Sequence, residues 1–167
     1  MRDTIDIEKV YDVHSQRLYN ISLRIVGCSN DAEEIMHDSL LKYWNFQRKS
    51  EIKNLGKWLT SICIRRSIDR LREKNRRNWF LESYEDPALQ EDAFSDEDQF
   101  EVDDIVKALH ELPDIYRAVV SMHLFEGYDY QEISQITGAK VGTIRSIYTR
   151  GRQKLAAILK HKRNERH

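Results

Sequence analysis

The chain has 167 residues, 40% of them hydrophobic, which is enough to bury the core of one domain or of two small ones. Its two prolines and six glycines favour helices over strands and tight turns, and its formal net charge is only −1. The two cysteines and six histidines lack metal-ligand spacing, and no run approaches the ~20 apolar residues of a membrane span. We therefore expect an all-α, cytoplasmic protein that has no metal site or other cofactor and does not insert into a membrane.

The small net charge averages three unlike segments. Residues 1–78 carry 16 basic and 11 acidic side chains. Residues 79–104 carry no basic and 11 acidic side chains, and residues 105–167 carry 11 basic and 6 acidic side chains. Two basic blocks around an acidic connector are typical of two nucleic-acid-facing modules joined by a linker. The sequence predicts one helical bundle over 5–78, a flexible acidic linker over 79–103 and a smaller bundle over 104–160.

Residues 5–26 form the first amphipathic pattern. Apolar side chains, with one histidine, recur there at steps of three or four: Val10, His14, Leu18, Ile21 and Ile25. This spacing predicts a helix with one buried stripe, and Gly27 ends it.

A second helix is predicted after Asn30, which we expect to cap it together with Glu33 three residues further on. Its inner face is predicted to be Ala32, Ile35, Met36, Ser39, Leu40 and Tyr43. Its outer side carries carboxylates interleaved with an apolar residue, namely Asp31, Glu34, Asp38 and Leu41. Such a cluster is usually solvated surface, and the alternative is a docking face for a basic partner.

A polar loop over 45–54 leads to a third predicted helix over 55–77. Between Lys57 and Arg77 there are eight Lys or Arg against two carboxylates. Trp58 and the loop residue Phe46 adjoin this basic surface. Aromatic rings beside cations suit an unpaired base, because the ring stacks on the base and the cations attract the backbone.

The stretch 129–155 reads as a short helix, a turn and a longer helix. Asp129 and Glu132 have capping-box spacing, and Gly138 marks the turn. A buried stripe is predicted at Ile144, Tyr148, Gly151, Leu155 and Ile158, and a polar face at Arg145, Ser146, Thr149, Arg152 and Gln153. From Lys140 to Arg163 there are eight Lys or Arg and no carboxylate. The pattern predicts a helix-turn-helix that reads the DNA major groove, and the alternative is a hairpin with a solvated basic face.

Three stretches carry a family resemblance by their order and spacing: DAEEIMHDSLLKYW (31–44), WLTSICIRRSIDRLR (58–72) and ELPDIYRAVVSMHLFEGYDYQEISQITGAKVGTIRSIYTRGRQKL (111–155). Together they resemble extracytoplasmic-function sigma factors, the minimal two-domain members of the sigma-70 family of bacterial transcription initiation factors. The resemblance covers the chain except for the linker and the two ends. It implies a protein without catalytic residues that binds core RNA polymerase and promoter DNA, with an anti-sigma factor as an expected further partner.

The resemblance also implies roles for individual residues. By this resemblance, the residues that dock on core polymerase are Asp31, Glu33, Glu34, Asp38, Leu41 and Trp44. Melting and reading of the minus-ten element fall to Phe46, Arg48, Lys49, Trp58, Arg65, Asp69 and Arg72. Reading of the minus-thirty-five element falls to Lys140, Thr143, Arg145, Ser146, Thr149, Arg150, Arg152 and Lys154.

Four positions depart from the family pattern. His37 and Leu40 replace a usual glutamine and a usual aromatic in the docking helix. Arg65 replaces a usual asparagine, which leaves the recognised minus-ten base open. Lys140 replaces a common serine, so we expect the reader helix to be less well capped.

Two other functions remain as alternatives. One is a conventional helix-turn-helix regulator with an N-terminal dimerisation or sensing domain. The basic, aromatic-flanked stretch 57–77 argues against it, because such a domain has no need of this surface. The other is a metal-dependent nuclease using the carboxylates of 79–104, a segment with no calcium-loop motif and no histidine partner.

Overall fold

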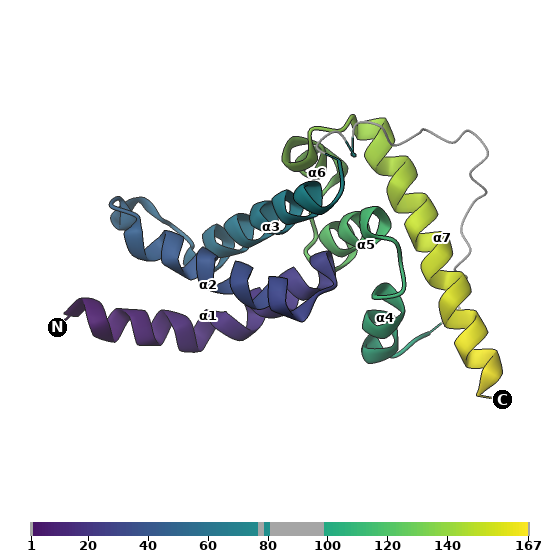
Figure 1. Cartoon of the computed structure of the whole chain (residues 1–167), viewed down its shortest axis with the longest axis horizontal. Helices are drawn as coiled ribbons and strands as arrows, with labels where there is room; N and C mark the ends of the chain where they lie inside the picture. The colour runs from purple at the N-terminus through teal and green to yellow at the C-terminus, as the bar shows by residue number, and fades with distance from the viewer. Residues whose placement is uncertain (1, 77–78, 81–98, 167) are drawn as a thin grey trace. The chain divides into compact units, whose positions relative to one another are not determined.

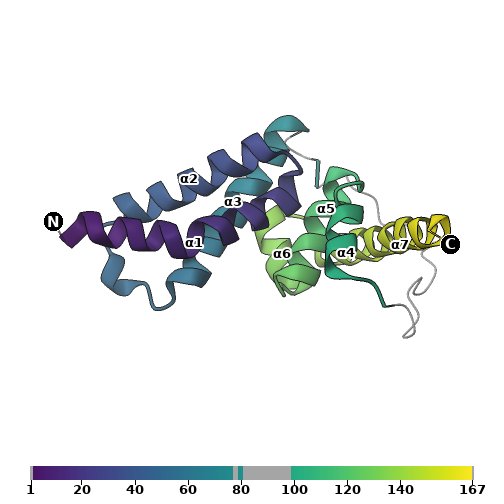
Figure 2. The same cartoon turned by 90° about the horizontal axis from the view of Figure 1, so that it is seen from below.

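A computed structural model describes residues 2–76, 79–80 and 99–166 of the chain (Figures 1 and 2). All regular structure in these ranges is helical, so the all-α prediction is confirmed. The chain divides into two compact units, Met1–Lys74 and Asn75–His167. The acidic linker predicted over 79–103 lies largely outside the described residues.

The first unit is a bundle of three long helices. They are α1 (Arg2–Val26), α2 (Ser29–Asn45) and α3 (Leu55–Lys74), and each packs against the other two (Figures 1 and 2). Their shared core is apolar and fully buried: Leu18, Ile21, Ile25, Ile35, Leu59, Ile64, Ile68 and Leu71. Burying these side chains is the main term that stabilises the bundle.

Two buried polar contacts join α1 to α3 inside this bundle. The hydroxyls of Ser22 and Ser67 lie 2.9 Å apart, and the Cys63 thiol donates to the carbonyl of Leu18 at 3.3 Å. Because a buried polar group without a partner is costly, these bonds favour one register of α1 against α3.

The helix starts in this unit differ in part from the sequence-based expectation. Asn30 does not cap α2, because the helix already begins at Ser29 and its N-cap residue Cys28 makes no side-chain capping bond. The capping residue that the sequence did not suggest is Asn54. Its side-chain oxygen accepts a hydrogen bond from the backbone N–H of Lys57 at 3.1 Å, in the first turn of α3.

The second unit has four α-helices in its described part. They are α4 (Val102–Leu109), α5 (Asp114–Val120), α6 (Tyr130–Thr137) and α7 (Val141–Glu165), with a π-helical turn η2 (Ser121–Phe125) after α5. Pro113 separates α4 from α5, because proline has no N–H to continue a helix and fits its N-terminus. The first three helices pack against α7, the long yellow helix of Figure 1.

The inner face of α7 follows the predicted stripe with one shift. Its buried residues are Thr143, Ile144, Ile147, Tyr148, Gly151, Leu155, Ala156 and Leu159. Ile158 was expected in this stripe but is only half-buried, and Leu159 lies in the core instead. A Cβ atom at Gly151 would lie 2.7 Å from a methyl carbon of Val120, so the close approach of α5 and α7 requires glycine there.

Candidate functional site

The helix-turn-helix begins with a complete capping box at α6. The Asp129 carboxylate accepts from the N–H of Glu132 at 2.7 Å, and the Glu132 carboxylate accepts from the N–H of Asp129 at 3.2 Å. The helix ends at Gly138, whose φ of 79° lies in the left-handed region. Both features agree with the sequence-based prediction.

The turn into α7 is held by hydroxyls of α6. Lys140 precedes α7 without a side-chain capping bond, as expected for a lysine at this position. The Ser134 hydroxyl donates to the carbonyl of Ala139 at 2.6 Å, and the Thr137 hydroxyl accepts from the N–H of Ala139 at 3.3 Å. These two bonds fix the angle at which α7 leaves the turn.

The outward side of α7 is basic. Arg145 and Lys154 are exposed, and the other residues expected on this side are half-buried, namely Ser146, Thr149, Arg150 and Arg152. The Thr149 hydroxyl donates back to the carbonyl of Arg145 at 2.9 Å. Thr143 is the exception, because it is only 7% exposed and packs inward. We therefore leave Thr143 out of the surface available to DNA.

Aromatic rings lie beneath two of these cations. The guanidinium carbon of Arg145 lies 5.7 Å from the ring centroid of Tyr130, and the ammonium of Lys154 lies 5.5 Å from that of Tyr116. Both distances are within the range of cation–π attraction. These contacts were not predicted from the sequence, because Tyr130 at the start of α6 and Tyr116 in α5 lie on other helices than the two cations.

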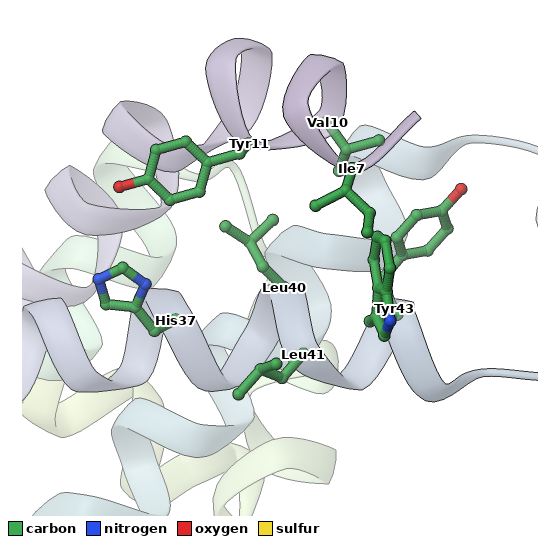
Figure 3. Close-up of a pocket in the computed structure, with 8 residues that line it drawn as sticks. Ile7, Val10, Tyr11, His37, Leu40, Leu41 and Tyr43 are labelled. Atoms are coloured by element: carbon green, nitrogen blue, oxygen red, sulfur yellow. The ribbon is translucent and has the colours of Figure 1, made fainter. Parts of the chain in front are cut away.

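The outer side of α2 combines an apolar groove with carboxylates. The groove has a volume of about 310 Å³ between α1 and α2 (Figure 3), and it is lined by Ile7, Val10, Tyr11, His37, Leu40, Leu41, Tyr43 and Trp44. Leu41 is 55% exposed, as predicted for an outward residue. Asp38 lies one helical turn before Lys42, and Glu33 lies 3.9 Å from His37. The rings of Tyr11 and His37 stack across the groove at 6.0 Å.

Asp31 does not lie on the outer face of α2, where the sequence analysis placed it. Its side chain is 15% exposed and forms ion pairs with Arg70, at 2.7 Å, and with Lys74. Glu34 is also turned toward α3, with a carboxylate oxygen 3.1 Å from Arg70. The hydrogen bond from Lys74 and the two nearby cations lower the pKa of Asp31, against the opposing effect of its burial. This carboxylate therefore ties α2 to α3.

The loop between α2 and α3 places aromatic rings beside a cation. Phe46 and Trp58 lie 5.1 Å apart between centroids, and Tyr43 meets Trp58 edge-on at 6.0 Å. Lys49, in the short 3₁₀ turn η1 (Lys49–Glu51), donates to the carbonyl of Trp44 at 2.9 Å. Its ammonium lies 5.5 Å from the ring centroid of Tyr43. The structure thus places Phe46 against Trp58, and Lys49 beside Tyr43 and Trp44.

Most of the other residues expected at the minus-ten element lie along α3. Trp58, Arg65, Asp69 and Arg72 follow one another at steps of seven, four and three residues, so they share one face of the helix. Arg65 is exposed, and Asp69 lies 3.4 Å from Arg72. Arg48 is exposed in the loop, 4.0 Å from Glu51.

Neither a metal centre nor a membrane span is found in residues 2–76, 79–80 and 99–166. No group of three His, Cys, Asp or Glu side chains there could hold a metal ion. No helix in the same ranges is both long enough and apolar enough to cross a bilayer.

Two family models match the chain, one to each unit. Sigma-70 region 2 matches residues 10–77, and sigma-70 region 4 matches residues 103–155. Each basic surface described above therefore falls within one of the two matched regions.

Relatives of known identity point to the same family. The ECF RNA polymerase sigma factor SigE of Mycolicibacterium smegmatis is 30% identical over 87% of this chain, which spans 58% of SigE. SigW of Bacillus subtilis is 25% identical over 90% of this chain and 87% of its own length. The solved sigma factor RpoE of Bartonella quintana, in complex with the anti-sigma factor NepR, covers 93% of this chain and has a TM-score of 0.59. At 23% identity, this last likeness supports the fold alone.

Sigma factors are transcription initiation factors and not enzymes, so these matches disfavour the nuclease and the conventional regulator. The two matched regions, the order of the helices and the relatives agree with one another. The chain belongs to the extracytoplasmic-function group of the sigma-70 family.

Proposed function

We propose that three surfaces of this protein divide the work of promoter-specific initiation. The outer side of α2 docks on core RNA polymerase, the 45–54 loop with α3 opens and holds the minus-ten element, and α7 reads the minus-thirty-five element. The observation that carries this proposal is the basic outer side of α7, which follows a capped α6 and a fixed turn. That arrangement is what a reader helix needs in the major groove.

The docking surface consists of the groove between α1 and α2 with the carboxylates of Glu33 and Asp38. Glu34, which is 59% exposed although it pairs with Arg70, adds a third carboxylate on the side of α3. Exposed Leu41 and half-buried Trp44 supply apolar surface, and burying this surface against a protein partner is favourable. The carboxylates favour a partner segment that is basic around an apolar centre. Asp31 is not part of this surface, but its ion pairs with α3 hold α2 in place.

The minus-ten surface combines stacking with charge. Phe46 and Trp58 form one aromatic cluster, so an unpaired base can extend a stack that already exists. Lys49 and exposed Arg48 lie in the same loop and attract the phosphates of the opened strand. Arg65, Asp69 and Arg72 continue along α3 as candidates for contacts to base edges and backbone.

The minus-thirty-five surface separates base contacts from phosphate contacts. Arg145, Ser146 and Thr149 lie opposite the buried stripe of α7, so we assign them to base edges. Arg150, Arg152 and Lys154 lie on the flanks together with Lys140 near the turn, and we assign them to phosphates. An arginine with two parallel donors suits the O6 and N7 acceptors of a guanine, which makes Arg145 the candidate for a specific contact.

Two further proposals follow from family membership. An anti-sigma protein is a partner of this chain, as NepR is of the Bartonella quintana sigma factor. The protein acts in the cytoplasm, where bacterial RNA polymerase transcribes. An anti-sigma partner that covers the α2 groove would compete with core polymerase, and both would need Leu41.

Co-elution with core polymerase tests the docking proposal. Asp38→Arg combined with Leu41→Ala should abolish co-elution while the circular dichroism of the free protein stays helical. A matched control is Lys107→Ala, an exposed change on α4 that should leave core binding intact. Retained binding by the double variant would refute the docking role of α2, and loss of helicity would mean that these residues belong to the core.

A further inference from the structure

Arg145 lies on the exposed side of α7, and an aromatic ring is its neighbour. The side chain is exposed, and its guanidinium carbon lies 5.7 Å from the ring centroid of Tyr130. Among the described residues, it forms no ion pair with a carboxylate. A free arginine samples many rotamers, and ordering it in a complex costs conformational entropy. Contact with a ring narrows this freedom before DNA binds.

The ring of Tyr130 is itself held in place by two others. The imidazole of His123 stacks on it at 4.8 Å with an interplanar angle of 23°. The Tyr148 ring lies 5.8 Å away and also meets His123 edge-on at 4.4 Å. His123 is fixed in turn, because its Nδ1 atom donates to the carbonyl of Tyr128 at 2.7 Å. The position of the Tyr130 ring is therefore fixed by its contacts with the rings of His123 and Tyr148.

The three elements of the helix-turn-helix region meet in this cluster. His123 belongs to η2, Tyr130 is the first residue of α6, and Tyr148 belongs to the buried side of α7. Tyr130 follows the capping residue Asp129 directly, so the capping box also fixes its backbone. A side chain outside the reader helix is thus placed to determine the direction in which Arg145 extends from it.

We propose that Tyr130 is a positioning residue that orients Arg145 and thereby sets the base preference of the upstream reader. This inference rests on the proposed function, in which Arg145 contacts a base edge. The ring limits the positions that the guanidinium samples before DNA binds, and it does not itself need to touch DNA. Loss of the ring should therefore reduce discrimination at a single base pair by about two- to fivefold, the scale of an exposed cation–π contact.

The test uses holoenzyme assembled from core polymerase and the full chain. Affinity is measured for a panel of single-base variants of the mapped upstream element and for unrelated DNA. The proteins compared are the parent, Tyr130→Leu, Tyr130→Phe, Arg145→Ala and the double variant Tyr130→Leu/Arg145→Ala. Leucine keeps apolar packing against His123 and Tyr148 but removes the ring, whereas phenylalanine keeps the ring and removes only the hydroxyl.

We expect Tyr130→Leu to lower discrimination at the base pair affected by Arg145→Ala, and at no other. It should have no further effect in the Arg145→Ala background, and affinity for unrelated DNA should not change. Tyr130→Phe should behave like the parent. These results require coupling between the two side chains, which a purely structural role of Tyr130 would not produce.

Three results would overturn the inference. If Arg145→Ala removes preference at one base pair and Tyr130→Leu does not, Tyr130 does not position Arg145. If Tyr130→Leu and Tyr130→Phe weaken every DNA alike, the hydroxyl contacts a phosphate instead. If Arg145→Ala itself alters no base preference, the failure lies in the proposed reading by α7, and the positioning role fails with it.

Discussion

Arg70 of α3 and Asp31 of α2 form an ion pair in which Nη1 and Oδ1 lie 2.7 Å apart. The two side chains are 22% and 15% exposed, so solvent screens this pair less than a surface pair. The same arginine reaches Glu34 at 3.1 Å, and Lys74 also pairs with Asp31. These ion pairs thus hold together α2 and α3, the two helices that carry the proposed docking and minus-ten surfaces.

Removing this carboxylate should destabilise the first unit. We expect Asp31→Asn to lower the free energy of unfolding by about 1–2 kcal/mol at neutral pH, between the values for exposed and buried pairs. Urea denaturation followed by tryptophan fluorescence, to which Trp44 and Trp58 of this unit contribute, measures the change. The exposed control Glu33→Gln should change stability by less than about 0.5 kcal/mol. Equal stabilities of the parent and Asp31→Asn would show that the ion pairs contribute nothing net.

The pH dependence of that difference has a definite sign. Because the folded pKa of Asp31 is lowered, its contribution is fully present above the unfolded pKa of about 3.9 and is lost as pH falls through the folded pKa. The stability gap between the parent and Asp31→Asn should therefore stay constant from about pH 8 to about pH 5 and shrink only below about pH 4. A gap that shrinks already between about pH 7 and about pH 6 would implicate another group.

His14 should make the first unit less stable in mild acid. Burial, and secondarily the charge of Arg17, lower the pKa of His14, whose Nδ1 lies 3.3 Å from an Arg17 nitrogen. As pH falls below the unfolded pKa of about 6.5, the unfolded chain binds a proton that the folded chain does not, so stability decreases until the folded pKa is reached. His14→Gln should reduce this loss, whereas His161→Gln, at an exposed position, should not. An unchanged pH profile in His14→Gln would contradict the assignment.

The capping box of α6 should be needed for a stable reader module. Asp129→Ala leaves the N–H of Glu132 without its acceptor and should cost about 1 kcal/mol. Thermal unfolding monitored by circular dichroism would register the loss. Gln131→Ala, at an exposed position in the same turn, serves as the control and should unfold like the parent. A variant Asp129→Ala with an unchanged melting temperature would mean that packing on α7 alone holds α6.

Lys154 should contribute salt-dependent affinity without base preference. Lys154→Ala should weaken holoenzyme binding to every upstream variant alike and lower the slope of log K against log salt by about one. Lys107→Ala on α4 is the matched control, since it removes an exposed lysine outside α7. If Lys154→Ala altered preference at one base pair, the division between base and phosphate contacts on α7 would be wrong.

The helical cores could be predicted from the sequence because periodicity reports burial directly. Leu18, Ile21 and Ile25 on α1, like Ile144 and Leu155 on α7, recur at helical spacing, and all are buried. The capping of α6 could also be predicted, because Asp129, Glu132 and Gly138 lie within one short segment. Local chemistry of this kind leaves a local signature.

Contacts between distant residues left no such signature. Asp31 looks outward on a helical wheel, but Arg70 and Lys74 approach it from a helix some forty positions later. The contact of Tyr130 with Arg145 crosses a turn whose angle depends on hydroxyls of α6. Periodicity also could not show that Thr143 packs inward. Thr143 lies beside the predicted stripe and not in it, so helical spacing alone leaves its burial undecided. The α2 groove likewise exists only once α1 is placed beside α2.

Transcription in vitro tests the central claim most directly. Core polymerase with and without the protein would transcribe a pool of genomic fragments, and the start sites would be mapped. We predict new starts that share an upstream and a minus-ten element at fixed spacing, and that disappear with Asp38→Arg/Leu41→Ala. The same set of start sites with and without the protein, although it co-elutes with core polymerase, would contradict the claim that it directs initiation.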